Sequence, residues 1–165
     1  MTKRVKVIGR KTKEPIFTAS SLLATAFQFY ESAKMIQSVC PDKPNGTPNL
    51  KCFKARYFLL GHAIETGLKA FLFLHGRSID HLKDLGHNLS GALQEAESFS
   101  FSCLNDTEES LITDLNEHYL KKYFEYEEVD YSKLPIMREL QILTGKILKE
   151  VKKEIKKNSG YYGDS

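Results

Sequence analysis

The feature that most constrains the fold of this chain is one long apolar run that three titratable residues interrupt. Residues 56–76 read RYFLLGHAIETGLKAFLFLHG, and His62, Glu65 and Lys69 stand in the middle of the run. Its length predicts a helix, and the apolar residues around most of its circumference predict that other helices surround it. Because a membrane span needs about 18 or more apolar residues with few or no charges, we expect a central core helix and no membrane partner.

The polar residues of this helix gather along one side. On a helical wheel of about 100° per residue, four of them fall within roughly 80° of His62: Lys51, Lys54, Glu65 and Lys69. Glu65 and Lys69 also have the order and spacing of a favourable i, i+4 ion pair. Two interpretations stay open: a solvent-facing stripe with one incidental ion pair, or a partly buried polar cluster that His87 reaches from the following loop.

The rest of the sequence predicts an all-α fold, because no segment alternates convincingly with the period of a strand. Asn88 is expected to cap the helix that follows it, and Asp106 with Glu109 to form a capping box. The expected helices cover residues 20–39, 50–75, 78–85, 89–97, 106–126 and 132–157. The architecture we expect is an up-down helical bundle of four long helices with one or two short ones.

Positive charge is concentrated at the two ends of the chain. We expect a basic N-terminal arm at residues 1–17, a helical bundle domain at 18–157 and a flexible tail at 158–165. Residues 1–14 carry six Lys or Arg against one Glu, and residues 146–157 carry six Lys against two Glu. Such clusters are typical of nucleic-acid contacts, but they also serve solubility alone.

The cysteines give no sign of a disulfide or metal framework. Cys40, Cys52 and Cys103 are odd in number and lack the spacing of metal ligands, so they indicate neither a disulfide scaffold nor a zinc site and fit a reducing, cytoplasmic compartment. The sequence also has no phosphate-binding glycine loop and no serine nucleophile motif. We expect no cofactor and no metal.

Two short motifs resemble those of the HEPN superfamily of prokaryotic helical bundles. The long second helix carries AIETGLKAFLFLHG, and the next loop ends in LGHNLSGAL. In HEPN-like proteins this helix carries Glu-x-x-x-Lys, and a Gly/Thr-His-x-Leu sequence begins the next one. The residues that match are Glu65, Lys69, Gly86, His87 and Leu89. The resemblance covers about residues 20–156 and implies a protein of a defence, toxin–antitoxin or nucleotidyltransferase-associated system.

The ribonuclease motif of that family is missing from its usual place. Family nucleases have an Arg followed after four to six residues by a His, near the start of the last long helix, and pair these residues across a homodimer to cleave RNA without metal. Here Arg138 is followed at those distances by Leu143, Thr144 and Gly145, and no histidine occurs after His118.

Other candidate site residues lie elsewhere in the chain. Arg56 and His62 have the spacing of the nuclease pair but stand on the second helix, so they form at most a displaced catalytic pair. Four further residues near position 120 could contact single-stranded nucleic acid through aromatic stacking and charge: Tyr119, Lys121, Lys122 and Tyr123. Such tyrosines more often pack at the edge of a bundle or at a dimer face.

Three functions follow as alternatives. The first is a HEPN-like binding or regulatory module without the nuclease motif, acting as a homodimer with a nucleotidyltransferase or antitoxin partner. The second is a metal-independent endoribonuclease that draws on Arg56, His62, Glu65 and His87, with the Arg stabilising phosphorane charge and a His moving the proton of the ribose hydroxyl. The third is an RNA-binding module that uses the basic ends.

Overall fold

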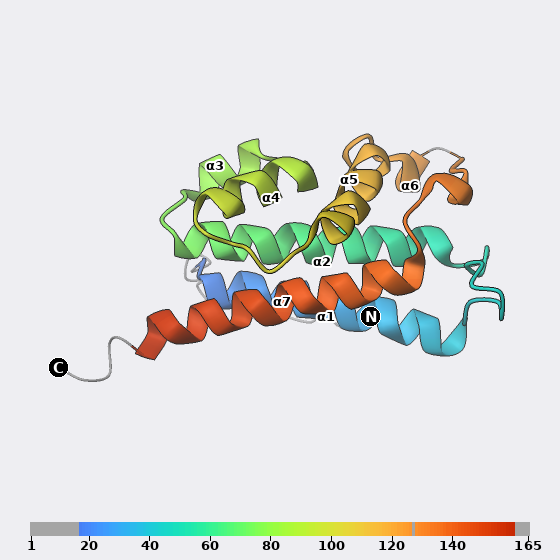
Figure 1. The fold of residues 1–165 in the computed structure, drawn as a ribbon, viewed down its shortest axis with the longest axis horizontal. Coiled ribbons are helices and arrows are strands. Elements are labelled where there is room, and N and C mark those ends of the chain that lie inside the picture. Colours follow the sequence, from blue (N-terminus) through green and yellow to red (C-terminus); the bar gives the residue numbers. More distant parts are fainter. Residues whose placement is uncertain (1–16, 127, 161–165) are drawn as a thin grey trace, which may run out of the picture.

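The chain folds into helices and connecting segments only, over the part that a computed structural model describes, residues 17–126 and 128–160 (Figure 1). The all-α prediction is therefore confirmed. The α-helices are α1 (Ala19–Val39), α2 (Phe53–Leu74), α3 (Ile79–Asp84), α4 (Leu89–Ser98), α5 (Asp106–Leu120), α6 (Tyr123–Tyr126) and α7 (Met137–Gly160), and a 3-10 turn covers Tyr131–Lys133. Most of the predicted basic arm and most of the predicted tail lie outside the described residues.

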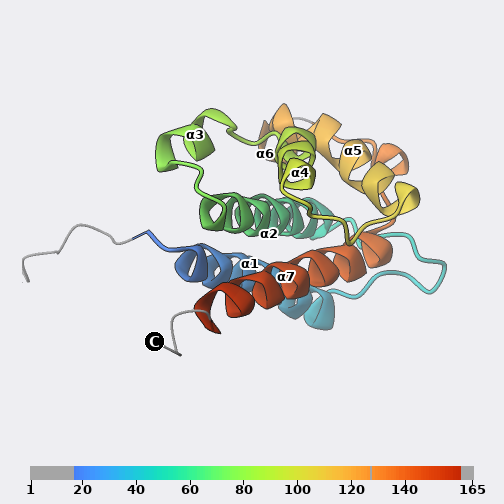
Figure 2. The same ribbon diagram turned by 60° about the vertical axis from the view of Figure 1, so that its left-hand side comes forward.

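Helix α2 lies at the centre of the fold, as its apolar circumference predicts. Helices α1 and α7 lie along one side of it, and α3, α4, α5 and α6 cover the other side (Figures 1 and 2). It contacts every other α-helix in the described part of the chain. Figure 1 also shows that α2 and α7 run in the same direction, opposite to α1, while α5 is steeply inclined to them.

The start of α5 and its end both differ from the expectation. The capping box is formed by Asn105 and Glu108, one residue before the predicted pair. The helix then stops at Leu120, because Lys122 takes a left-handed backbone conformation with φ of 57°. The predicted single helix over 106–126 is therefore two helices, and Tyr123 belongs to the second.

The last helix begins later than predicted and extends further. Pro135 precedes α7, which starts at Met137 and continues to Gly160. The Pro135 carbonyl accepts a buried hydrogen bond of 2.6 Å from the Tyr57 hydroxyl, which ties the entry of α7 to α2. A stripe of apolar residues along α7 is buried, whereas Ile136 is 57% exposed because it lies before the first helical turn; the stripe includes Leu140, Leu143, Ile147, Val151 and Ile155.

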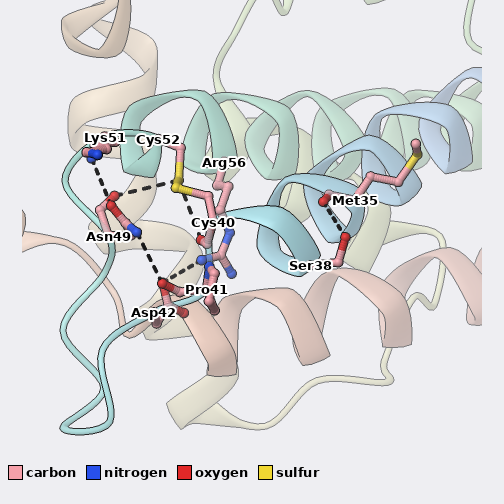
Figure 3. The surroundings of a disulfide bond; sticks show 9 residues. All are labelled: Met35, Ser38, Cys40, Pro41, Asp42, Asn49, Lys51, Cys52 and Arg56. Carbon is pink, nitrogen blue, oxygen red and sulfur yellow. Dashed lines mark hydrogen bonds and ion pairs between the residues drawn. A yellow bond between two sulfur atoms is a disulfide. The ribbon is translucent and has the colours of Figure 1, made fainter.

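Two of the three cysteines are paired, which corrects the expectation that none would be. Cys40 at the end of α1 and Cys52 at the start of α2 form a disulfide across a sequence separation of 12 residues (Figure 3). It closes the connection between the two helices at its base, whereas Cys103 is a free thiol. This single disulfide is added to a packed helical core. The fold therefore differs from small scaffolds whose stability depends on several disulfides.

By length and composition, α2 is the one helix in the described part of the chain that could cross a membrane. However, 61% of its most apolar stretch is buried by the other helices. A core helix of this kind satisfies the same length and composition criteria as a membrane span. Its apolar residues are therefore accounted for by the bundle core.

Candidate functional site: a polar cluster on the central helix

The polar residues of α2 converge on one buried carboxylate. Glu65 is only 9% exposed. Its Oε1 accepts a bond of 2.7 Å from Lys69 Nζ, one turn along the same helix. Its Oε2 lies 2.9 Å from His87 Nδ1 and accepts a bond of 2.6 Å from the Tyr119 hydroxyl. We call His62, Glu65, Lys69, His87 and Tyr119 the α2 polar cluster.

Tyr119 reaches this carboxylate because α2 carries a glycine where the ring passes. A Cβ atom built on Gly61 would lie 2.6 Å from two ring carbons of Tyr119, closer than packed atoms approach. The missing side chain lets α5 bring its tyrosine against the α2 backbone. Tyr119 is 3% exposed, so its ring packs inside the protein and offers no free face on which a nucleic-acid base could stack.

The proton positions in the cluster follow from the carboxylate. Ionised Glu65 only accepts hydrogen bonds, so the Tyr119 hydroxyl and the His87 Nδ1–H both donate to it. His62 Nδ1 also contacts the Tyr119 oxygen, and it must donate because the only proton on that oxygen is already used. Neutral His62 then has an unprotonated Nε2, the arrangement of a potential proton acceptor.

The surroundings of the cluster hold Glu65 charged and His62 neutral. Burial by itself raises the pKa of Glu65, but hydrogen bonds from His87, Lys69 and Tyr119 outweigh it and hold the pKa below its ordinary value. Burial lowers the pKa of His62 more than the charge of Glu65 raises it, and the neighbouring His87 lowers it further. Burial and the charge of Glu65 raise the pKa of Tyr119, so its hydroxyl stays protonated.

The cluster also joins three separate segments of the chain. Lys69 Nζ donates a second bond of 2.8 Å to the Gly86 carbonyl, in the turn that enters α4. Asn88 caps α4 as predicted, and the side chain of Asn116 on α5 accepts a bond of 2.7 Å from the Leu89 N–H. The polar groups of α2, the α4 entry and α5 are therefore largely satisfied by one another.

The aromatic residues around His62 limit its freedom. Its ring centroid lies 4.4 Å from that of Phe58 and 5.1 Å from that of Phe29. The ring of His87 stacks at 5.9 Å. These contacts leave His62 half-buried, with its ring held between aromatic groups and a second imidazole.

Arg56 does not join the cluster, so the displaced Arg56–His62 pair is not assembled. Its side chain is completely buried, and its guanidinium pairs with Asp42 at 2.5 Å (Figure 3). The guanidinium also donates a bond of 3.4 Å to Gln141 on α7. His62 instead contacts α5 and the His87 ring. The two residues are directed to different neighbours because they lie on different sides of α2.

The other predicted nucleic-acid contacts remain at the surface. Lys121 and Lys122 are exposed in the break between α5 and α6. Lys121 Nζ lies 5.6 Å from the ring centroid of half-buried Tyr123, a cation–π contact within the protein. Lys121, Lys122 and Tyr123 therefore do not form one contact surface with Tyr119, whose side chain is buried in the core.

The arrangement offers no metal centre over the residues that the structure describes, where no group of three His, Cys, Asp or Glu could hold an ion. Lys69 lines a cavity of about 160 Å³ that is otherwise mostly apolar. This volume is below the roughly 300–1,000 Å³ of ordinary ligand pockets. The cluster can therefore exchange protons and bind side chains, but that cavity is too small for a substrate.

Sequence reasoning found Glu65, Lys69 and His87 but missed the function of Tyr119 as their hydroxyl partner. The only local signal is Gly61, a helix-interior glycine one turn before Glu65. A glycine there costs about 1 kcal/mol of helix propensity, which indicates a close approach by another element. Which element approaches depends on tertiary packing.

Comparison of this chain with models of protein families, with curated proteins and with solved structures found no significant match.

Proposed function

We propose that this protein is a HEPN-like helical binding or regulatory module whose α2 polar cluster stabilises the fold instead of cleaving RNA. The observation that carries this proposal is the use of every hydrogen-bonding partner around Glu65. Lys69, His87 and Tyr119 all bond the carboxylate, and Lys69 also bonds the α4 entry. A phosphate would have to displace these bonds before Lys69 or the Tyr119 hydroxyl could act on it.

The position of Arg56 supports the same proposal. Nuclease chemistry of the expected kind needs an exposed guanidinium to stabilise charge on the phosphorane. Arg56 is 0% exposed and pairs with Asp42 in the core. A buried cation with an internal counter-ion is a structural feature and does not serve a substrate.

A second candidate function is a metal-independent endoribonuclease based on the two imidazoles. His62 and His87 are half-buried neighbours whose rings stack at 5.9 Å. Neutral His62 could accept a proton and His87 could donate one, which is the division that acid–base cleavage of RNA requires. In this candidate Lys69, the cation of the α2 polar cluster, is already bonded to the carboxylate and is not free to bind a phosphate.

One cleavage assay separates the two candidates. Purified protein is incubated with fluorescently labelled RNA in the presence of EDTA, next to His62→Ala and His87→Ala variants. The proposal expects intact RNA in all three reactions. Metal-independent cleavage by the wild type that disappears in both variants would establish the endoribonuclease and overturn the proposal.

The proposal includes a homodimer, and several exposed apolar side chains support self-association. Met35 and Val39 on α1 are 69% and 83% exposed, and Ile142 on α7 is 61% exposed. Sedimentation equilibrium distinguishes a single 18.8 kDa chain from a species of twice that mass. A single-chain mass at concentrations of about 100 μM would exclude a dimer of ordinary affinity.

A further inference from the structure

A groove between α1, α7 and the segment that follows α4 has the composition of an anion site. It encloses about 520 Å³ and is lined by Tyr30, Cys103, Ile142, Gly145, Lys146, Lys149, Glu150 and Lys153. Three lysines therefore face one glutamate within it. Its volume lies in the range of ordinary ligand pockets, and it is separate from the α2 polar cluster.

Tyr30 and Gly145 shape the floor of this groove. A Cβ atom on Gly145 would lie 2.6 Å from the Tyr30 hydroxyl oxygen, so the glycine lets the phenol approach α7 closely. The Tyr30 hydroxyl makes no hydrogen bond to another residue in the described part of the chain. Lys34 Nζ lies 5.3 Å from the centroid of the same ring, but it is paired with Glu31 at 3.1 Å and is not one of the lining residues.

The lysines of the groove belong to a longer cationic face of α7. On a helical wheel, its six lysines between Lys146 and Lys157 fall within about 140°, and Glu150 and Glu154 lie at one edge of that arc. This face extends over roughly 16 Å of helix. It is long enough to meet several neighbouring phosphate groups.

The existing ion pairs of these lysines are weak competitors for an anion. Lys146 pairs with Glu108 at 2.7 Å and Lys153 with Glu150 at 2.9 Å, but both lysine side chains are at least 40% exposed. Exposed pairs contribute only about 0–1 kcal/mol. Lys149 is exposed and has no carboxylate within ion-pair distance among the described residues.

The free cysteine of the groove does not oppose an anion. Burial, with the charge of Glu150, raises the pKa of Cys103 to about 11. The thiol is therefore uncharged near neutral pH and contributes no negative charge to the lining. Glu150 is the only acid among the lining residues.

We propose that this groove binds a phosphate-bearing ligand, with Lys146, Lys149 and Lys153 contacting phosphate oxygens and the Tyr30 hydroxyl donating a hydrogen bond to one of them. The shared chemistry is a phosphate ester, supplied either by a nucleic-acid strand or by a free nucleotide. This inference goes beyond the proposed function and does not depend on the polar cluster.

The test compares anion binding by the full chain and three variants. The probes are pyrophosphate, ATP and a fluorescent single-stranded oligonucleotide of about 12 nucleotides, each at about 50 and about 200 mM salt. We expect the wild type to bind at least one probe more weakly at the higher salt. The double variant Lys149→Glu/Lys153→Glu should lose at least about tenfold in affinity, and Tyr30→Phe a smaller but measurable part.

Lys83→Glu is the control for reversing one surface charge outside the groove, because Lys83 is a 70% exposed lysine on α3 that also has a carboxylate neighbour. It should bind within about twofold of the wild type, since surface charges far from a bound phosphate are screened. All variants keep the six basic residues at positions 1–14, so their differences report the groove alone. Binding by the oligonucleotide alone identifies a strand as the ligand, and binding by ATP or pyrophosphate as well identifies the phosphate group.

Three results would overturn the proposal. The first is no binding of any probe by the wild type at low salt. The second is a loss of affinity in Lys83→Glu as large as that in the double variant. The third is an unchanged affinity in Tyr30→Phe. Either result would mean that general surface charge, and not the groove, explains the binding. Unchanged circular dichroism spectra and unfolding midpoints confirm that the variants are folded.

Discussion

Helix α2 buries one cation and one anion, and the protein neutralises them in different ways. Arg56 lies near the start of the helix and, among the described residues, has a single carboxylate partner, Asp42, from the loop between α1 and α2. Glu65 lies in the middle and has three side-chain partners from α2 itself, the α4 entry and α5. The anion is supported by several helices, whereas the counter-ion of the cation comes from one loop, with one amide contact from Gln141 on α7.

The disulfide explains how one loop can be sufficient for Arg56. The Cys40–Cys52 bond closes the base of the loop that carries Asp42 (Figure 3). A closed loop has fewer conformations to lose, so holding Asp42 against the guanidinium costs less entropy. The comparison indicates that a covalent bond helps to hold the partner of the buried charge at the start of α2. At the middle of α2, side chains from several segments hold one another in place around the buried charge.

The largest effect is expected from removing the counter-ion of Arg56. Asp42→Asn keeps the size of the side chain but leaves an uncompensated cation in the core, which should lower the free energy of unfolding by about 3 kcal/mol or more. Urea denaturation measures this loss. The double variant Asp42→Asn/Arg56→Met should recover most of it, because it removes the buried charge as well. A single variant as stable as the wild type would show that Arg56 does not depend on Asp42.

Reduction of the disulfide should have the next largest effect. Opening a loop of this length should lower the free energy of unfolding by about 2–3 kcal/mol, measured by urea denaturation with and without a phosphine reductant. Cys103→Ser should respond like the wild type, because Cys103 is unpaired, and Cys40→Ser/Cys52→Ser should not respond. If the loop holds Asp42 in place, reduction should cost less in Asp42→Asn; equal costs in both backgrounds would contradict that coupling.

A smaller loss is expected where α5 meets α2. Gly61→Ala places a methyl group against the Tyr119 ring, and overpacking of this kind costs about 1–3 kcal/mol. Gly76→Ala is not a suitable control because Gly76 has a positive φ. Thr66→Ala, on the same helix as Gly61, serves as the control instead. Thr66→Ala should change stability by less than about 0.5 kcal/mol. A tolerated Gly61→Ala would contradict the close approach of Tyr119.

The smallest effect is expected from pH. Because folding lowers the pKa of His62, the unfolded chain binds more protons below about pH 6.5, and stability should fall as the pH drops through that range. Charged and titratable groups that act on His62 are Glu65, His87, Lys69 and Glu125. The lowered pKa of Glu65 predicts a further loss of stability below about pH 4.5.

Thermal unfolding midpoints between about pH 8 and pH 4 measure this dependence. His62→Gln should flatten the part near pH 6 and keep the part below about pH 4.5. Stability that rises on acidification from pH 7 to pH 5 would contradict the neutral state of His62.

The sequence was sufficient to predict the central position of α2, because a helix that is apolar around most of its circumference is stable only when other helices surround it. It was insufficient at the ends of α5. Asn105 with Glu108 and Asp106 with Glu109 satisfy the same capping pattern, and only the packed helix selects the first. The sequence around Lys122 contains no glycine or proline that would predict the break between α5 and α6.

The candidate site was predictable only in part for a related reason. Glu65, Lys69 and His87 follow from spacing and from a family resemblance, but the contact of Tyr119 with Glu65 joins residues 54 positions apart. The Cys40–Cys52 disulfide was missed because an argument from compartment and cysteine number does not show that α1 and α2 bring the two residues together.

The central claim is that Glu65 holds α2, the α4 entry and α5 together. The most direct test is the free energy of unfolding of Glu65→Gln, which keeps the shape of the side chain and removes its charge. We predict a loss of about 1.5–3 kcal/mol, because charged hydrogen bonds to Lys69, His87 and Tyr119 are weakened together. Unchanged or increased stability, as expected for a group retained for activity at the expense of stability, would contradict the claim.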